Sequence, residues 1–498
     1  MTKLLFLGLD SAEPDLILEW LDSGDLPALQ ALRERSVWGK VQTPLGFGNG
    51  VMWPSLFTAV NPAKHGRYFF RQVRPGTYQA SLFREDTDFK RDPFWAALSR
   101  DGQRVAVIDM VRAPLTKDLN GIQLADWMTH DRSGPPRSWP PDLISNVIAQ
   151  YGDDPLGGHS DAVGRGAAEY VELYNRMLER VETKTALSCD LLGQGPWDLF
   201  MTVYADPHDV GHQCWHIHDA SHPRHDAALA RQIGDPVKNI YTAIDKNVER
   251  LVQAAGPEAT IIVFTGPGMG PGYTGNVWLD QILRRLERGP TTDGLHYVDT
   301  LKSVYRSVVP SSLRDRLRST AERSEESMLA ADRSRRKCFV VPHNENSGAI
   351  RLNLVGREPD GKVNPGSEAE AFCKALTHDL MDIVKLDTGE PLVEEVVRVA
   401  ERFKGDYLDE LPDLLVIWNR KSPITVFGSP NIGEIEASYP GSRTGDHTPR
   451  GLFIACGRGI SPCALSNNVS VMDIGTTIMF WRSLTLPDVD GTPIPELC

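Results

Sequence analysis

The sequence predicts an α/β fold in which a mostly parallel central sheet is flanked by helices and carries an inserted cap. Its 498 residues, of which 41% are hydrophobic, are enough to bury a large core. Short apolar runs of strand length recur along the chain, and amphipathic stretches lie between them. Such runs are typical of parallel strands covered on both faces. The predicted strands are residues 4–9, 105–109, 199–204, 260–265, 414–417 and 452–456.

Helical patterns connect these strands. They cover residues 15–21 and 26–33, which are separated by SGDLP, and then residues 166–192 and 236–254. Residues 134–195 and 286–337 fit the alternation of strands and helices least well. We predict that these two segments form a cap over the carboxyl ends of the strands, where open α/β sheets bind ligands. We predict a core domain made of residues 1–133, 196–285 and 338–498. Residues 134–195 are predicted as a cap insertion, and residues 286–337 as a cap or linker insertion.

Charge and composition restrict the classes of function. The formal net charge of -13 argues against nonspecific nucleic-acid binding, because phosphate backbones require a basic surface. No apolar run approaches the roughly 18 residues that cross a membrane, and the start of the chain lacks the order of a secretory signal. The seven cysteines have no CxxC spacing, which favours reduced thiols. The sequence therefore predicts a cytoplasmic enzyme with a small-molecule substrate, and it gives no indication of oligomeric state.

The first predicted strand delivers Asp10 to its carboxyl end, and residues 47–70 follow with FGNGVMWPSLFTAVNPAKHGRYFF. This pair resembles the start of the alkaline phosphatase superfamily fold, in its type I phosphodiesterase and nucleotide pyrophosphatase branch. There a threonine or serine nucleophile opens the frame TxPxWxSLxTGxxPxxHG. The residues that match this frame are Trp53, Ser55, Leu56, Thr58, Pro62, His65 and Gly66. Asn49 occupies the nucleophile position, and a carboxamide cannot form the covalent intermediate of an activated hydroxyl.

Later segments keep the order of the same branch and extend the resemblance over nearly the whole chain. They are NENSGAIRLNLVGREPDGKVNPG at residues 344–366, LPDLLVIW at 411–418, TGDHTPRGLFIACGRGI at 444–460 and VMDIGTTIMFWRSLTLPDVDGTPI at 471–494. The resemblance implies an alkaline phosphatase-like core and a metal-dependent enzyme that acts on phosphoesters or sulfate esters.

The resemblance also implies which residues bind metal. Family members hold one ion with an Asp and a His spaced DxxxH plus a distal His, and a second ion with the first-strand Asp, the nucleophile and an adjacent Asp-His pair. In this chain His212 stands at the first His position, His208 replaces the Asp, and His447 is the distal His. Gly266 and Pro267 replace the Asp-His pair, so only the first-strand aspartate of the second set remains.

The predicted centre is therefore a single site made by His208, His212 and His447, with Asp10 and Asn49 nearby as catalytic residues and Asp10 as a further ligand. Side chains four positions apart on a helix share a face, and three histidines with an open position form a known catalytic zinc arrangement that acidifies bound water. Zinc is the expected cofactor, and iron or manganese would also accept imidazole and carboxylate ligands.

Other assignments at this centre stay open. Asp206 and Asp209 flank His208, and either is an alternative source of a carboxylate ligand. The histidine-rich segment can also be a polar helix face that binds no metal. Substrate contacts are predicted at Asn344, His216 and Arg71, with Arg165, Tyr170 and His130 as further candidates.

The predicted function is a metal-dependent hydrolase for a phosphate ester, a sulfate ester or a related anionic small molecule, working through one metal site without a covalent Thr or Ser intermediate. Two alternatives remain: a group transferase or lyase in specialised biosynthesis, and an inactive pseudoenzyme that only binds its ligand.

Overall fold

The computed structural model describes residues 2–130, 132, 134–157, 166–289, 324–344, 347–438 and 442–498. The chain forms two compact units. Unit 1 comprises residues 1–67, 84–272 and 440–498, and unit 2 comprises residues 68–83 and 273–439. Among the described helices, none has the length and apolar character needed to cross a membrane.

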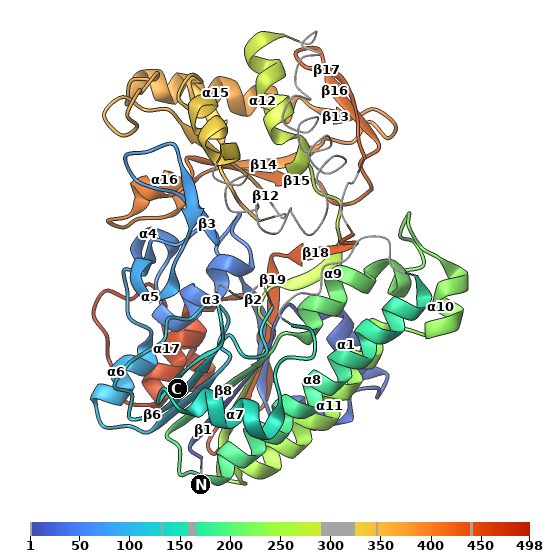
Figure 1. The fold of residues 1–498 in the computed structure, drawn as a ribbon, viewed down its shortest axis with the longest axis vertical. Coiled ribbons are helices and arrows are strands. Elements are labelled where there is room, and N and C mark those ends of the chain that lie inside the picture. The colour runs from blue at the N-terminus through green and yellow to red at the C-terminus, as the bar shows by residue number, and fades with distance from the viewer. Residues whose placement is uncertain are drawn as a thin grey trace. The chain divides into compact units, whose positions relative to one another are not determined.

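Unit 1 is built on a ten-stranded sheet (Figure 1). Its strands are β1 (Leu4–Leu9), β2 (Val37–Gln42), β5 (Val105–Ile108), β6 (Gly121–Ala125), β7 (Arg137–Trp139), β8 (Leu199–Tyr204), β9 (Thr260–Phe264), β19 (Arg450–Cys456), β20 (Cys463–Ala464) and β21 (Val469–Ser470). The order is β20-β2-β19-β9-β1-β8-β5-β6-β7, with β21 beside β2. β1 pairs in parallel with β8 and β9, and β5 with β6 and β8, whereas β19 and β7 run antiparallel to their neighbours. The predicted α/β fold with a mostly parallel central sheet is therefore confirmed.

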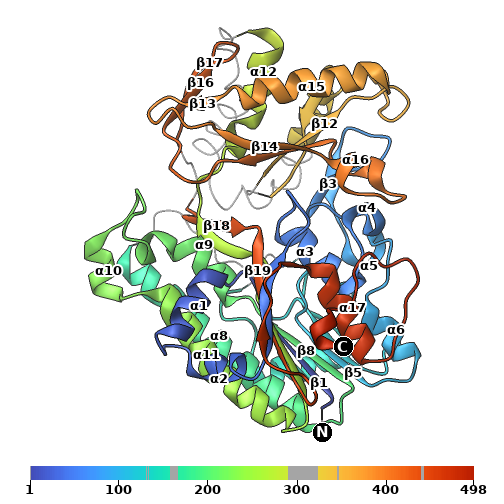
Figure 2. The same cartoon turned by 180° about the vertical axis from the view of Figure 1, so that it is seen from behind.

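Both faces of β1 are buried, which explains its continuous apolar sequence. Leu5, Leu7 and Leu9 belong to one hydrophobic core, and Leu4 and Phe6 belong to the other, as the two-residue period of a strand requires. The first core is closed by α1 (Pro14–Asp22), α2 (Pro27–Arg33), α8 (Ala167–Gly193), α9 (Asp206–His218) and α11 (Pro236–Ala255). The second is closed by α3 (Asn49–Thr58), α6 (Phe94–Arg100) and α17 (Val471–Trp481), which Figure 2 shows from behind. The other helices of this unit are α4 (Pro62–His65), α5 (Glu85–Asp88), α7 (Leu143–Tyr151) and α10 (Ala227–Ile233).

Helix α8 occupies a different place from the one predicted. We predicted that residues 134–195 form a cap insertion, but these residues belong to unit 1, and α8 packs along α11 against the first core. The physical reason is that Arg180 and Lys184 lie on the buried face of α8 and interrupt its apolar stripe. Their ion pairs let the helix bury charged residues against the sheet.

Unit 2 contains a four-stranded antiparallel sheet with the order β11-β12-β15-β14 and a three-stranded sheet with the order β13-β16-β17. The strands of these two sheets are β11 (Cys338–Val340), β12 (Ser347–Leu352), β13 (Val384–Lys385), β14 (Val393–Arg398), β15 (Leu414–Trp418), β16 (Val426–Ser429) and β17 (Gly433–Glu436). The hairpin of β3 (Arg71–Val73) and β4 (Ala80–Leu82) and the helices α12 (Leu279–Arg288), α15 (Ser367–Met381) and α16 (Val399–Arg402) complete the unit. Helices α12 and α15 and both sheets share one hydrophobic core.

The predicted boundaries differ from these units in two further ways. Residues 338–498 were predicted as one part of the central core, but the structure assigns residues up to 439 to unit 2. The predicted strand at 414–417 is accordingly β15 of an antiparallel sheet, because a short apolar run does not by itself distinguish the two kinds of sheet. Most of the predicted insertion at 286–337 lies outside the described residues.

Candidate metal centre

The candidate centre lies at the carboxyl ends of the parallel strands of unit 1. Asp10 directly follows β1, and helix α9, which carries His208 and His212, starts two residues after the neighbouring strand β8. His447 lies on β18 (Gly445–Thr448), which pairs with β10 (Gly268–Pro271) just beyond the end of β9. Asn49 is the first residue of α3. The strand order thus brings four distant parts of the sequence to one edge of the sheet.

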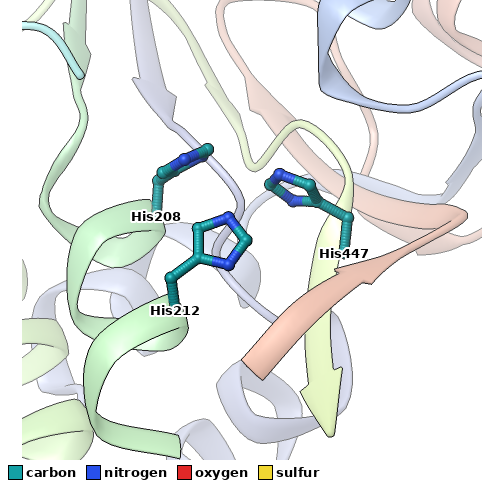
Figure 3. A group of neighbouring side chains, drawn as sticks. All are labelled: His208, His212 and His447. Atoms are coloured by element: carbon teal, nitrogen blue, oxygen red, sulfur yellow. The ribbon is translucent and has the colours of Figure 1, made fainter. Parts of the chain in front are cut away.

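Three imidazole rings converge at this edge (Figure 3). The ring centroids of His208 and His212 are 4.5 Å apart, and each lies 4.8 Å from the centroid of His447. One potential ligand atom of each residue lies within 4.8 Å of the others. All three side chains are buried, as expected for a site that excludes competing water.

Hydrogen bonds set the orientation of two of the rings. His212 Nδ1 lies 2.8 Å from the carbonyl oxygen of Gly445, so Nδ1 carries the proton and donates it. His208 Nδ1 lies within 3.4 Å of Asp10 Oδ2 and 3.3 Å of Ser11 Oγ. The Nε2 atoms of His208 and His212 are buried and have no hydrogen-bond partner among the described residues. Buried polar atoms are nearly always partnered, and an imidazole held by its other nitrogen is the usual ligand of a metal ion, so the residues fit a divalent cation.

The electrostatic environment keeps these rings in their metal-binding form. Burial lowers the pKa of all three imidazoles below the ordinary value for histidine. The positive charge of Arg443 lowers the pKa of His212 further, and His208 does the same for His447. Neutral imidazole is the form that binds a cation, so the pocket is prepared for one at neutral pH.

Asp10 joins the histidines to the start of α3. Its Oδ1 accepts a hydrogen bond from Trp53 Nε1 at 2.8 Å, and its Oδ2 lies 2.6 Å from His130 Nε2 and 3.3 Å from Asn49 Nδ2. Burial alone would raise the pKa of Asp10, but the charges and hydrogen bonds of His130 and His208 outweigh burial and hold this pKa well below its usual value. Asp10 is therefore a carboxylate that aligns His208.

The structure brings together most of the predicted site and adds one residue. Asp10, Asn49 and the three histidines lie in one cluster, as predicted. His130 was predicted only as a candidate substrate contact, yet its ring stacks on His208 with centroids 3.5 Å apart and planes 9° apart. It follows β6, which is parallel to β5, so the strand-end rule that located Asp10 could also have indicated His130.

The position of the lost Asp-His pair also lies at this cluster. A Cβ atom added to Gly266 would lie 3.5 Å from Asp10 Oδ1 and 3.3 Å from the Trp53 ring. Gly266 has φ +71°, which few residues with a side chain adopt without strain. The backbone conformation at this position therefore favours glycine over the aspartate that the family pattern has there.

The open carboxylate alternatives have other partners. Arg180 Nε lies 2.8 Å from Asp206 Oδ1, and Arg180 also pairs closely with Asp209. All three side chains are buried. Neither aspartate belongs to a ligand group among the described residues. These aspartates brace the start of α9 against α8.

The predicted substrate contacts fall in both units. His216 lies one turn after His212, its Nδ1 is 3.0 Å from Thr444 Oγ1, and burial lowers its pKa to about 4. Arg71 and Asn344 belong to unit 2, where Arg71 Nη2 lies 3.5 Å from Glu326 Oε2 and the Asn344 carbonyl accepts a hydrogen bond from Asn276. Their contact with a substrate remains a prediction, and Arg165 lies outside the described residues.

His65 supports the loop that follows α3 in a neutral form. Its Nδ1 accepts the backbone N–H of Arg67 at 3.1 Å, and its Nε2 lies 3.2 Å from Ser55 Oγ. Burial, with the positive charge of Arg67, lowers the pKa of His65 to about 3.

Acid should therefore destabilise the fold through His65. The unfolded chain binds a proton below about pH 6.5, whereas folded His65 stays neutral until about pH 3, so stability is lost as pH falls through this interval. The expected slope is about 1.4 kcal/mol per pH unit below pH 6. Urea unfolding of the metal-free protein at pH 7, 6 and 5 measures it, and His65→Gln should lack this contribution. Parallel pH dependences of the two proteins would contradict the assignment.

Comparisons with known proteins agree with this geometry. The sequence profile of the type I phosphodiesterase/nucleotide pyrophosphatase family matches residues 4–426. The solved structure of phosphonoacetate hydrolase from Sinorhizobium meliloti 1021 in complex with phosphonoformate is similar, with 16% identity, a TM-score of 0.55 and coverage of 97% of this chain and 96% of that chain. Murine ectonucleotide pyrophosphatase/phosphodiesterase 5, as an inactive variant in complex with AMP, is similar with 12% identity, a TM-score of 0.51 and coverage of 99% and 98%. No curated protein matches the chain at a significant level.

The structural likenesses, at these identities, show that the chain shares the fold of these two proteins. The family match covers most of the chain and includes the strand that Asp10 directly follows and the helix that starts at Asn49. The chain therefore belongs to the type I phosphodiesterase/nucleotide pyrophosphatase family and is a hydrolase-like, metal-dependent enzyme of the alkaline phosphatase superfamily.

Proposed function

We propose that the protein hydrolyses an anionic ester, of the phosphate, phosphonate or sulfate class, at an ion held by His208, His212 and His447, without a covalent enzyme intermediate. The proposal is carried by the Nε2 atoms of His208 and His212, which are buried beside the ring of His447 and have no hydrogen-bond partner in the described part of the chain. Three imidazoles favour zinc, with iron or manganese as alternatives. When bound, such an ion supplies a Lewis acid and lowers the pKa of coordinated water.

The surrounding residues orient the ligands and attract the substrate. The Gly445 carbonyl holds His212, and Asp10 holds His208, so both rings keep fixed directions. Arg443 is close enough to lower the pKa of His212 and of His447, and its positive charge favours an anionic substrate at the same place. In unit 1, His216 is proposed as a substrate contact and the side-chain amide of Asn49 as a hydrogen-bond donor to the substrate. Asn344 and Arg71, which belong to unit 2, stay predicted substrate contacts.

The proposal is tested by turnover of a panel of substrates. The metal-free full-length protein is loaded with Zn2+, Mn2+ or Fe2+ and incubated with phosphodiesters, phosphomonoesters, sulfate esters and phosphonate esters, and the products are identified by mass spectrometry. Metal-dependent release of free alcohol and anion supports hydrolysis. Transfer of the group to an added acceptor, or elimination, would favour the transferase or lyase alternative, and binding of metal without any turnover would favour the pseudoenzyme.

No covalent phosphoryl or sulfuryl group should accumulate on the segment around Asn49. The neighbouring hydroxyls are engaged, since Ser55 Oγ contacts His65 and Thr58 Oγ1 donates to the carbonyl of Pro54 at 2.6 Å, and both are buried. Rapid acid quenching during turnover, followed by peptide mass spectrometry, checks this. A modified peptide within residues 46–64 would overturn the proposed route.

A further inference from the structure

We propose that Arg67 is a positioning residue for Asn49, because its guanidinium holds the first turn of α3 in place of the backbone donor that Pro54 lacks. Asn49 is the first residue of this helix. The inference rests on the proposed function in one respect, namely that Asn49 is assigned there as a hydrogen-bond donor to the substrate. Arg67 itself acts through the backbone of α3.

The first turn of α3 lacks two of the usual supports of a helix start. Asn49 lies between Gly48 and Gly50, and glycine restricts the backbone least of all residues. The N-cap residue is Gly48, which has no side chain to accept a backbone N–H. Pro54 lies inside the helix without a backbone N–H, so it cannot donate to the carbonyl of Gly50 four residues earlier, and its ring pushes against that carbonyl. The Gly50 carbonyl therefore needs a donor from another segment of the chain.

Arg67 supplies this donor. Its Nε donates to the carbonyl oxygen of Gly50 at 2.9 Å, and its Nη1 donates to Glu85 Oε1 at 2.8 Å. Both side chains are buried, and a buried charge is costly unless it is paired, as these two are. The planar guanidinium carries its donors at fixed angles, so the ion pair with Glu85 also fixes the direction of Nε.

The surroundings of Arg67 keep this ion pair charged. Burial lowers the pKa of Arg67 to about 10, and the charge of Glu85 opposes this shift, so the guanidinium stays protonated at neutral pH. Burial alone would raise the pKa of Glu85, but the charges of Arg67 and Arg112 outweigh burial and lower it. The ring of Phe89 lies with its centroid 5.7 Å from Arg67 Cζ. Arg67 is thus a fixed cation that can hold a backbone carbonyl in one place.

Hydrogen exchange tests the inference without reference to activity. The backbone N–H groups of Val51 and Met52 donate to the Gly48 carbonyl at 3.0 and 3.2 Å, so their exchange rates report the opening of the first turn. Arg67→Lys keeps a cation beside Glu85 but places a methylene group where Nε lies. Exchange at Val51 and Met52, measured by mass spectrometry on the full-length protein, should become about tenfold faster, as expected for the loss of one buried hydrogen bond.

Pro54→Ala provides a rescue. Alanine at this position has the backbone N–H that proline lacks and can donate to the Gly50 carbonyl within the helix. The double variant Arg67→Lys/Pro54→Ala should therefore exchange within about twofold of the wild-type rate. A new N–H in α3 would not repair a general loss of packing around residue 67.

Arg351→Lys is the matched control in unit 2. Arg351 is also buried, and it also bonds a carboxylate and a backbone carbonyl, namely Glu358 Oε1 at 2.7 Å and the carbonyl of Leu411 at 2.8 Å. This variant loses the same kind of interaction elsewhere and should leave the exchange of α3 unchanged.

The outcomes separate this inference from the proposed function. Unchanged exchange in Arg67→Lys, or faster exchange that Pro54→Ala does not reverse, overturns the anchoring role of Arg67. On the best substrate of the panel, kcat should fall about tenfold in Arg67→Lys with KM nearly unchanged, and Pro54→Ala should restore it. If exchange responds as expected but kcat does not, the anchor stands and the assignment of Asn49 as a donor to the substrate is wrong.

Circular dichroism and thermal unfolding check that each variant is folded. If Arg67→Lys does not fold, the double variant Arg67→Met/Glu85→Gln, which removes both charges together, takes its place. It should show the same faster exchange and the same rescue by Pro54→Ala.

Discussion

Replacing His212 with alanine should remove one equivalent of bound zinc and lower turnover by about a thousandfold, which corresponds to about 4 kcal/mol of transition-state stabilisation. The reason is that His212 combines two roles: its Nδ1 is anchored on Gly445 and its Nε2 faces the other two rings with no other partner among the described residues. An alanine side chain has no nitrogen atom and can fill neither role. Elemental analysis and steady-state kinetics on the best substrate of the panel measure the two effects.

His447→Ala should have a similar effect, since its ring completes the same group from β18. His218→Ala is the control, because its ring contacts Asp235 and lies outside that group. If metal content and turnover stay unchanged in both His212→Ala and His447→Ala, the assignment of a metal site is wrong. The histidine-rich helix is then a polar face that serves only packing.

Replacing Arg180 with methionine should lower the free energy of unfolding by about 3–5 kcal/mol, because it leaves buried aspartates without their cation. The Arg180 guanidinium is the buried partner of Asp206 and Asp209, and Asp154 Oδ1 lies 3.9 Å from it. Urea unfolding measures the loss. Arg176→Met, one turn earlier on α8, removes an exposed pair with Glu172 and should cost less than about 1 kcal/mol. Equal losses in the two variants would mean that the buried network adds nothing beyond a surface ion pair.

The central sheet and the core of the site could be predicted because each left a local pattern. The apolar run of β1 and the position of Asp10 after it follow from strands buried on both faces. The spacing of His208 and His212 follows from the period of a helix, and the motif order located Asn49 and His447.

The remaining features depend on contacts that no local pattern contains. The packing of helix α8 against the sheet depends on Arg180 and Lys184 on its buried face, and the aspartates of other segments make the burial of these charges possible. The end of β6 indicates the edge of the sheet at which His130 lies, but its contacts with Asp10 and His208, which are distant in sequence, leave no local pattern. Pairing of this kind is a property of the folded chain.

The bond between His212 and Gly445 joins two residues 233 positions apart, and His447 lies on the same short strand as Gly445. An ion that joins His212 to His447 therefore behaves as a reversible cross-link across a very long loop. Closing a loop of this length in an unfolded chain costs about 5 kcal/mol of conformational entropy. Folding has already closed this loop before the ion binds. The binding free energy of the ion therefore stabilises the contact between α9 and the last part of the chain. Occupancy of the centre and attachment of β18 to α9 are thus thermodynamically linked, because each stabilises the other.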